Sequence, residues 1–307
     1  MAKMYFYKFN INSKIYDVYK NPELQDEILQ QVFEAIDTDL SVKLPKYDEE
    51  VLESDIEYKF CDIDKDKENR IITGRLVKIF DGETQSYDRS HDTVTTNFEE
   101  DKASSATFCF DVNHEEIAFI TRVGFRYLQF GRVFKLLLEK VFQEDSFVLV
   151  LEKNVGELKE KVYALKRVIK VNTSIIPPNA NESEFENLLG PSVAEFRETG
   201  ATKYTQGIEV PVKGKGTINA HTTFFERIFY AIGKGYAEMV VDGRDAENEK
   251  VSISSDEDTP YKDTIPDVEK DSIPAFRERA GISIAKLLRD KNKIKLRSEV
   301  SDKEEHK

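Results

Sequence analysis

The feature that most constrains this fold is the shortness of its apolar segments and the way their spacing alternates along the chain. Segments in which every second residue is apolar, typical of strands, alternate with segments in which apolar residues recur every three or four positions, typical of helices. No apolar run approaches the roughly 18–20 residues that a membrane helix requires. Because hairpins also occur among the interleaved elements, the pattern predicts an α+β protein: a mixed β-sheet with hairpins and packed helices, followed by a smaller α+β unit.

The clearest strand signals are an aromatic and β-branched segment at residues 4–11 and two hairpins, over 106–122 and 236–254. In the first hairpin, two apolar strands flank a polar turn at 113–116. Single strands are predicted at 70–80, 147–151, 171–176 and 206–212. Helices are predicted at 23–37, 130–142, 155–168, 182–199, 224–236 and 273–288, with a break at Gly190-Pro191 in the fourth.

Two polar stretches and one double proline divide the chain further. Residues 45–70 carry ten acids and five bases and are expected to form a solvated loop or an irregular segment. Residues 83–105 are expected to form a mobile loop or a long hairpin connection. Pro177-Pro178 stops a strand, so we predict a boundary there. The predicted domains are an N-terminal α+β domain at 1–176, a C-terminal α+β unit at 177–272, and a helix with a basic tail at 273–307.

Charge and cysteine content constrain the ligands and the cellular compartment that we expect for the protein. With 45 Lys+Arg against 58 Asp+Glu, the formal charge of −13 repels phosphate at long range, so any nucleic-acid contact must use local basic patches. The N-terminus has no apolar stretch of signal-peptide length, and we expect a cytoplasmic protein without membrane insertion. Two cysteines are too few for a disulfide framework, and Cys109 is interpreted as a small core residue.

The sequence contains none of the common motifs that identify a catalysed reaction. It has no phosphate-binding GxxxxGK[ST] loop, no GxSxG nucleophile turn, and neither CxxC nor HExxH, so no metal site of the usual kinds is expected. A metal nuclease needs carboxylates and a lysine on one face of a strand, but Glu152 and Lys153 are adjacent and alternate in direction. The sequence thus leaves open whether the chain is an enzyme, and it indicates no cofactor.

Three basic segments are the candidate contacts for nucleic acid. The first interleaves basic residues with aromatic ones after the first hairpin, an arrangement suited to stacking and phosphate contact. The others follow the helix at 155–168 and the last helix, where 286–297 holds six bases and one acid. The candidate residues are Arg122, Arg126, Arg132, Lys135, Lys166, Arg167, Lys170, Lys291, Lys293, Lys295 and Arg297. Solvated surface charge, an acidic protein partner, or another copy of this chain are the alternatives.

Several short motifs resemble a group of bacterial proteins that carry domain-of-unknown-function labels and occur on mobile islands beside phage-defence genes. The motifs are Tyr5-Phe6-Tyr7, Phe110-Asp111 with Phe119, Ile175-Ile176-Pro177-Pro178-Asn179, and Gly235-Tyr236 with Val241-Asp242-Gly243. More distantly, the size and the middle strand–helix run resemble the soluble DNA-binding component of the Kiwa defence system. The resemblance implies a bacterial cytoplasmic protein that acts against phage or within a mobile element, and it carries over no active-site residues.

The leading hypothesis from the sequence is a binding or sensor protein of bacterial antiviral defence. It would act through homo-oligomerisation and contact with nucleic acid or with a phage or defence-system protein. The alternatives are a metal-dependent nuclease effector and a non-catalytic structural subunit of a defence complex. Buried carboxylates that converge in a cleft beside a lysine would favour the enzyme, and a flat basic groove would favour binding.

Overall fold

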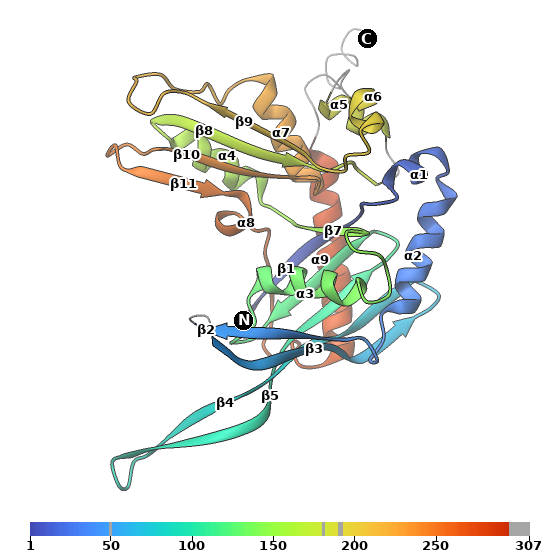
Figure 1. The fold of residues 1–307 in the computed structure, drawn as a ribbon, viewed down its shortest axis with the longest axis vertical. Coiled ribbons are helices and arrows are strands. Elements are labelled where there is room, and N and C mark those ends of the chain that lie inside the picture. Colours follow the sequence, from blue (N-terminus) through green and yellow to red (C-terminus); the bar gives the residue numbers. More distant parts are fainter. Residues whose placement is uncertain (49–50, 180–181, 190–192, 295–307) are drawn as a thin grey trace.

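A computed structural model describes residues 1–48, 51–179, 182–189 and 193–294 of the chain. Two β-sheets form its frame and helices pack against both, which confirms the α+β class (Figure 1). A mixed sheet was expected, but every strand pairing in these ranges is antiparallel. One reason is that several neighbouring strands, such as β5 with β6 and β10 with β11, are joined by short turns, which reverse the chain direction.

The first sheet has eight strands in the order β12-β1-β6-β5-β4-β3-β2, with β7 also paired to β1. Its strands are β1 (Ala2–Ile11), β2 (Ser41–Asp48), β3 (Val51–Asp66), β4 (Ile71–Asp88), β5 (Thr93–Asp111), β6 (Glu116–Thr121), β7 (Phe147–Leu151) and β12 (Asp263–Ile265). The predicted hairpin over 106–122 is confirmed as β5 and β6.

The second sheet has four strands in the order β11-β10-β8-β9. They are β8 (Arg167–Ile175), β9 (Tyr204–Glu209), β10 (Ala237–Arg244) and β11 (Lys250–Ser254). This sheet therefore takes strands from both sides of residue 176. A second hydrophobic core lies between it and the helices that pack against it, with Leu158, Phe185, Phe229 and Val241 among its buried residues.

Each predicted helix overlaps an observed one, and the last one runs five residues past its predicted end. The helix predicted at 155–168 ends at Ala164, and the short helices at 15–20 and 255–258 have no predicted counterpart. The observed helices are α1 (Ile15–Lys20), α2 (Glu23–Ala35), α3 (Tyr127–Leu138), α4 (Val155–Ala164), α5 (Glu182–Leu189), α6 (Val193–Glu198), α7 (Thr223–Lys234), α8 (Ser255–Asp258) and α9 (Ile273–Lys293). The break expected at Gly190-Pro191 lies outside the described residues. Within the described ranges, none of these helices combines the length and apolarity needed to cross a membrane.

Strand β1 explains how the first sheet is covered on both faces. Its side chains alternate, so Tyr7 and Phe9 join the core formed with α2 and α3, while Met4 and Phe6 face the opposite way. On that opposite face, α9 contributes a stripe of buried residues spaced three or four apart: Phe276, Ala280, Ser283, Ile284 and Leu287. The first half of β1 therefore presents an apolar surface on the face against which α9 packs.

The segment expected to be a loop at 45–70 is instead mostly strand, as β2 and β3. Its high charge concealed a period of two, because Tyr58 and Phe60 point into the core while Glu57 and Lys59 alternate with them. Most of 83–105 also lies in strands, since β4 and β5 continue as one long hairpin to Asp88 and Thr93. That outcome matches the long hairpin connection and not the loop.

Candidate anion site at the junction of the two sheets

A buried ionic cluster lies where α9 crosses the first sheet. The Lys291 ammonium donates hydrogen bonds to Glu116 Oε1 and to Glu152 Oε1, each at 2.7 Å. Glu116 begins β6 and Glu152 follows β7, and these two side chains are 0% and 1% exposed. Lys291 comes four residues after Leu287, so it continues the buried stripe of α9 onto the polar end of the sheet.

Burial controls the protonation of this cluster. Desolvation raises the pKa of Glu116 from 4.5 to about 7, the Lys291 charge opposes that rise, and the Glu152 charge adds to it. The Glu116 Oε2 atom is buried without a hydrogen-bond partner among the described residues, which further disfavours the ionised form. The two carboxylates raise the pKa of Lys291 above its usual value despite burial, so Lys291 stays charged.

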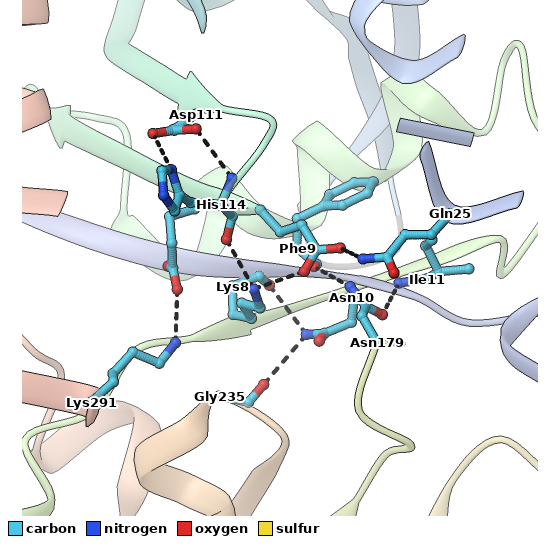
Figure 2. Close-up of polar contacts among 12 residues, drawn as sticks. Lys8, Phe9, Asn10, Ile11, Gln25, Asp111, His114, Asn179, Gly235 and Lys291 are labelled. Carbon is cyan, nitrogen blue, oxygen red and sulfur yellow. Dashed lines mark hydrogen bonds and ion pairs between the residues drawn. The ribbon is translucent and has the colours of Figure 1, made fainter. Parts of the chain in front are cut away.

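A second ion pair, between Lys8 and Glu115, lies beside the first. Lys8 of β1 is opposite Glu116 of β6 in the strand register, which brings the two ion pairs together. Lys8 Nζ is 2.8 Å from Glu115 Oε2 and also donates to the His114 carbonyl oxygen at 3.0 Å (Figure 2). Gln25 of α2 donates to the other oxygen of Glu115 at 2.7 Å. Glu115 adopts a left-handed backbone conformation, φ +57°, which is uncommon for a residue other than glycine.

Amide side chains then connect this cluster to the second sheet. Asn179 accepts from the Ile11 N–H at 2.9 Å and donates to the Phe9 carbonyl oxygen at 3.1 Å. Asn10 donates to the Gly235 carbonyl oxygen at 3.3 Å, and Figure 2 shows both amides reaching across the junction. Buried polar side chains therefore fix the end of α7 and the segment after β8 against β1.

Gly235, which ends α7, fits closely against this cluster. Its φ of +83° is left-handed. A Cβ atom there would lie 2.6 Å from Glu152 Oε1 and 2.9 Å from Lys8 Cβ. Both the backbone conformation and the lack of space require glycine at this position.

The cluster forms one wall of a cavity of about 660 Å³. Six lysines line the cavity, whereas only two acidic residues, Glu152 and Asp290, do so. The lysines are Lys153, Lys159, Lys262, Lys286, Lys291 and Lys293. Lys153 is fully buried and pairs with Asp256 at 2.8 Å, whereas Lys262 is exposed and has no ionic partner in the described part of the chain. This cavity, called the lysine cavity below, is therefore a concave surface of net positive charge.

The start of α4 adds to this positive field. Asn154 caps the helix by accepting from the Glu157 N–H at 3.2 Å, and Val155 and Gly156 line the cavity. The first N–H groups of a helix have no acceptor within the helix, and the helix dipole places partial positive charge there. Such a helix end beside several lysines suits a phosphate or carboxylate group, and the volume lies within the range of small-molecule sites.

The first basic segment of the sequence lies around α3. Arg122 pairs with Asp271, and Lys135 pairs with Asp145 at 2.6 Å. Arg126, the N-cap residue of α3, and Arg132 on α3 are exposed and have no ionic partner in the described part of the chain. Within that part, this segment thus presents two exposed arginines near the start of α3.

The second basic segment lies at the second sheet and the third on α9. Lys166 is exposed, Arg167 donates to three backbone carbonyls, and Lys170 lies 3.9 Å from Glu209. Lys293 pairs with Asp290 at 2.8 Å. Of all the candidates, Lys291 and Lys293 line the lysine cavity. Lys295 and Arg297 lie outside the described residues.

Sequence reasoning missed Lys8, Glu116 and most of the cavity, although a signal existed. Strand β1 has polar residues at 8 and 10 on the face where Met4 and Phe6 are apolar, which marks a polar junction at the end of a buried strand. The prediction that Glu152 and Lys153 diverge agrees with the structure, since Glu152 meets Lys291 and Lys153 meets Asp256. Among the described residues, no group of three or more His, Cys, Asp or Glu side chains is placed to hold a metal ion.

An α+β protein with a buried ionic junction and a lysine-lined cavity is the class that these observations define. The chain belongs to the family described as domain of unknown function DUF4747, whose profile it matches over residues 2–280. The match includes Glu116 and Glu152 and ends inside α9, before Lys291. No curated protein and no solved structure matches the chain.

Proposed function

We propose that this protein is a binding or sensor protein that contacts nucleic acid through the lysine cavity and functions as a homo-oligomer in bacterial antiviral defence. The observation that carries the nucleic-acid part is the cavity itself: six lysines and the start of α4 surround a space of about 660 Å³ in a chain of net charge −13. Because the net charge of the chain repels phosphate at long range, this concentration of positive charge favours a specific anion contact.

The defence setting of this proposal rests on the resemblance of short motifs to proteins beside phage-defence genes. In that setting the ligand is phage or host nucleic acid, and a phage or defence-system protein would be the second partner. A cytoplasmic location follows from the same proposal, because the ligand is there.

The direct test is fluorescence anisotropy with labelled single-stranded DNA, double-stranded DNA and RNA at two salt concentrations. Binding is expected at low salt. Affinity should fall by roughly 0.7–0.9 log units per decade of salt for each phosphate neutralised. Absence of binding to all three probes at low salt would refute the nucleic-acid proposal.

Charge-reversal variants locate the contact. Lys159→Glu with Lys262→Glu should reduce affinity and flatten the salt dependence, because both side chains line the cavity and neither has an ionic partner among the described residues. Arg126→Glu with Arg132→Glu makes the same charge change on α3 and serves as the matched variant. If only the α3 variant loses affinity, the ligand binds at α3 and the cavity assignment is wrong.

The nuclease alternative is favoured by one observation, which is that Glu116 and Glu152 converge on Lys291 beside a cavity. In such an enzyme a divalent cation would stabilise the charge that develops on phosphate. Purified protein with plasmid DNA or RNA and Mg²⁺ or Mn²⁺ should then produce cleavage that a chelator abolishes and Glu152→Gln reduces. If the substrates stay intact under every condition, the nuclease alternative is refuted and only the binding proposal remains.

A further inference from the structure

Residues 82–88 of β4 and 93–99 of β5 form a two-stranded arm that projects away from the rest of the molecule (Figure 1). Strand β3 pairs with β4 only as far as Ile79, and β6 pairs with β5 only from Ala106. Within the described residues, neither outer edge of the arm therefore has a partner strand. Isolated two-stranded ribbons are marginally stable in water, so this arm needs a surface to pack against.

One face of the arm carries its large apolar side chains. Tyr87 lies directly opposite Val94, and Phe98 follows Val94 by four residues on the same strand, so all three share one face. They are 58%, 61% and 65% exposed. The opposite face has small polar residues such as Thr84 and Thr95. Tyr87 and Val94 thus form an exposed apolar pair near the tip of the arm, and Phe98 adds a third apolar side chain on the same face, an arrangement typical of an interaction surface.

A groove of about 560 Å³ lies at the base of the arm. It is lined by the open edge of β5 at 103–105 and by the end of β6 with the residues that follow it. Val123 in this groove is 99% exposed, and the two charged residues lining it, Arg122 and Lys270, are basic side chains that form surface ion pairs with Asp271 and Asp267. The groove thus combines an unpaired strand edge, an exposed apolar side chain and two basic side chains whose surface ion pairs contribute little to stability.

Charge decides what the arm can bind. Residues 81–102 hold seven acids and two bases, a net charge of −5, which rules out nucleic acid as the occupant and opposes contact between two arm tips. The base groove has an open edge that accepts another strand and an apolar residue for the arm's apolar face, and its two basic side chains can exchange their surface ion pairs for the acids of the arm. Its complement is therefore present on every copy of this chain.

We propose that the arm of one copy docks in the base groove of a second copy, and that the second arm docks reciprocally in the first groove. The two arms then lie antiparallel across a twofold axis, which closes the assembly at two subunits. Val94 of one copy meets Val123 of the other, and the acidic tip lies near Arg122 and Lys270. This interface uses no residue of the lysine cavity. A result that refutes the dimer therefore leaves the proposed nucleic-acid binding unaffected, and the reverse also holds.

Sedimentation equilibrium or size-exclusion chromatography with light scattering tests the assembly. The full chain should have twice its mass of 35.4 kDa at micromolar concentration. Val94→Ser with Phe98→Ser should weaken the dimer at least about 100-fold, because each apolar side chain contributes tenfold or more when buried. Thr84→Ala with Thr95→Ala, on the opposite face, should leave the mass unchanged. The arm lies outside the hydrophobic cores, so both variants should fold, as circular dichroism would show.

Cysteine cross-linking tests the arrangement itself. In a Cys61→Ser background, Val94→Cys with Val123→Cys should form a disulfide-linked dimer on mild oxidation, and Thr95→Cys with Val123→Cys should not. A monomeric wild-type protein, a dimer that Val94→Ser with Phe98→Ser does not weaken, or equal cross-linking in the two cysteine pairs would each overturn the proposal.

Discussion

Replacing Lys291 with methionine is the sharpest test of the buried cluster. Methionine is unbranched and apolar, so it retains much of the side-chain volume of lysine and removes the ammonium. Lys291 makes two hydrogen bonds of 2.7 Å to carboxylates that are essentially inaccessible to solvent. The variant therefore leaves Glu116 and Glu152 facing each other without a counter-charge.

The expected cost follows from these contacts. A hydrogen bond to a charged group contributes about 1.5–3 kcal/mol, so two contribute about 3–6 kcal/mol. Proton uptake by one carboxyl recovers part of this loss. We expect Lys291→Met to lower the free energy of unfolding by about 3–5 kcal/mol at pH 7, the usual range for a broken buried ion pair. That is a large part of the roughly 5–15 kcal/mol typical of a folded domain.

Urea denaturation followed by far-ultraviolet circular dichroism measures this change. Lys293→Met is the matched control, because Lys293 lies in the same helical turn but forms an exposed pair with Asp290. It should cost at most about 1 kcal/mol. Adding Glu116→Gln and Glu152→Gln to Lys291→Met should restore much of the loss by removing the unpaired charges. If Lys291→Met is no more destabilising than Lys293→Met, the cluster does not hold α9 on the sheet and the reasoning fails.

Three further predictions concern single groups. Burial raises the pKa of Glu116 to about 7, so its contribution to stability is fully present below pH 4.5 and is lost as the pH rises through 7. Glu116→Gln should remove that fall from the pH profile of the unfolding free energy, and an unchanged profile would contradict the assignment. Burial raises the pKa of Cys109 to about 12, so a thiol reagent at pH 8 should modify Cys61 in the folded protein and Cys109 only after unfolding. Gly235→Ala should destabilise by more than 1 kcal/mol, while Gly281→Ala, in an exposed and open position of α9, should stabilise by about 0.5–1 kcal/mol; similar effects from both would refute the close fit at Gly235.

The sequence by itself determined the elements whose signal is local. Apolar spacing located β1, the hairpin of β5 and β6, and the helices α2, α3 and α7 close to their observed positions. Each of these elements buries an apolar stripe of a helix or one face of a strand, and the spacing of apolar residues within the segment itself is enough to reveal such a pattern. The core position of Cys109 followed in the same way, from alternation along one strand.

Elements with a high charge were harder to recognise, because charge obscures periodicity. Strand β3 has its buried aromatic residues, Tyr58 and Phe60, among acids and lysines, and its pairing with β4 on one side and β2 on the other makes it a strand. The arm likewise has few residues to bury, so its local pattern resembles that of a loop. Strand pairing satisfies the backbone hydrogen bonds there, and the apolar spacing within one segment does not show which segment it pairs with.

Only the tertiary structure decided which charged residues are buried. Lysine and glutamate are almost never fully buried unless they are paired, so Lys291 in a basic stretch suggests an exposed side chain. Its partners lie 175 and 139 residues away, and they reach it only because α9 packs across the first sheet, on β5 and β6, and brings Lys291 to the residue that follows β7. The lysine cavity has the same origin. Helix α9 contributes Lys286, Lys291 and Lys293, whereas Lys153 precedes α4, Lys159 lies on α4 and Lys262 precedes β12, and no single stretch of sequence brings them together.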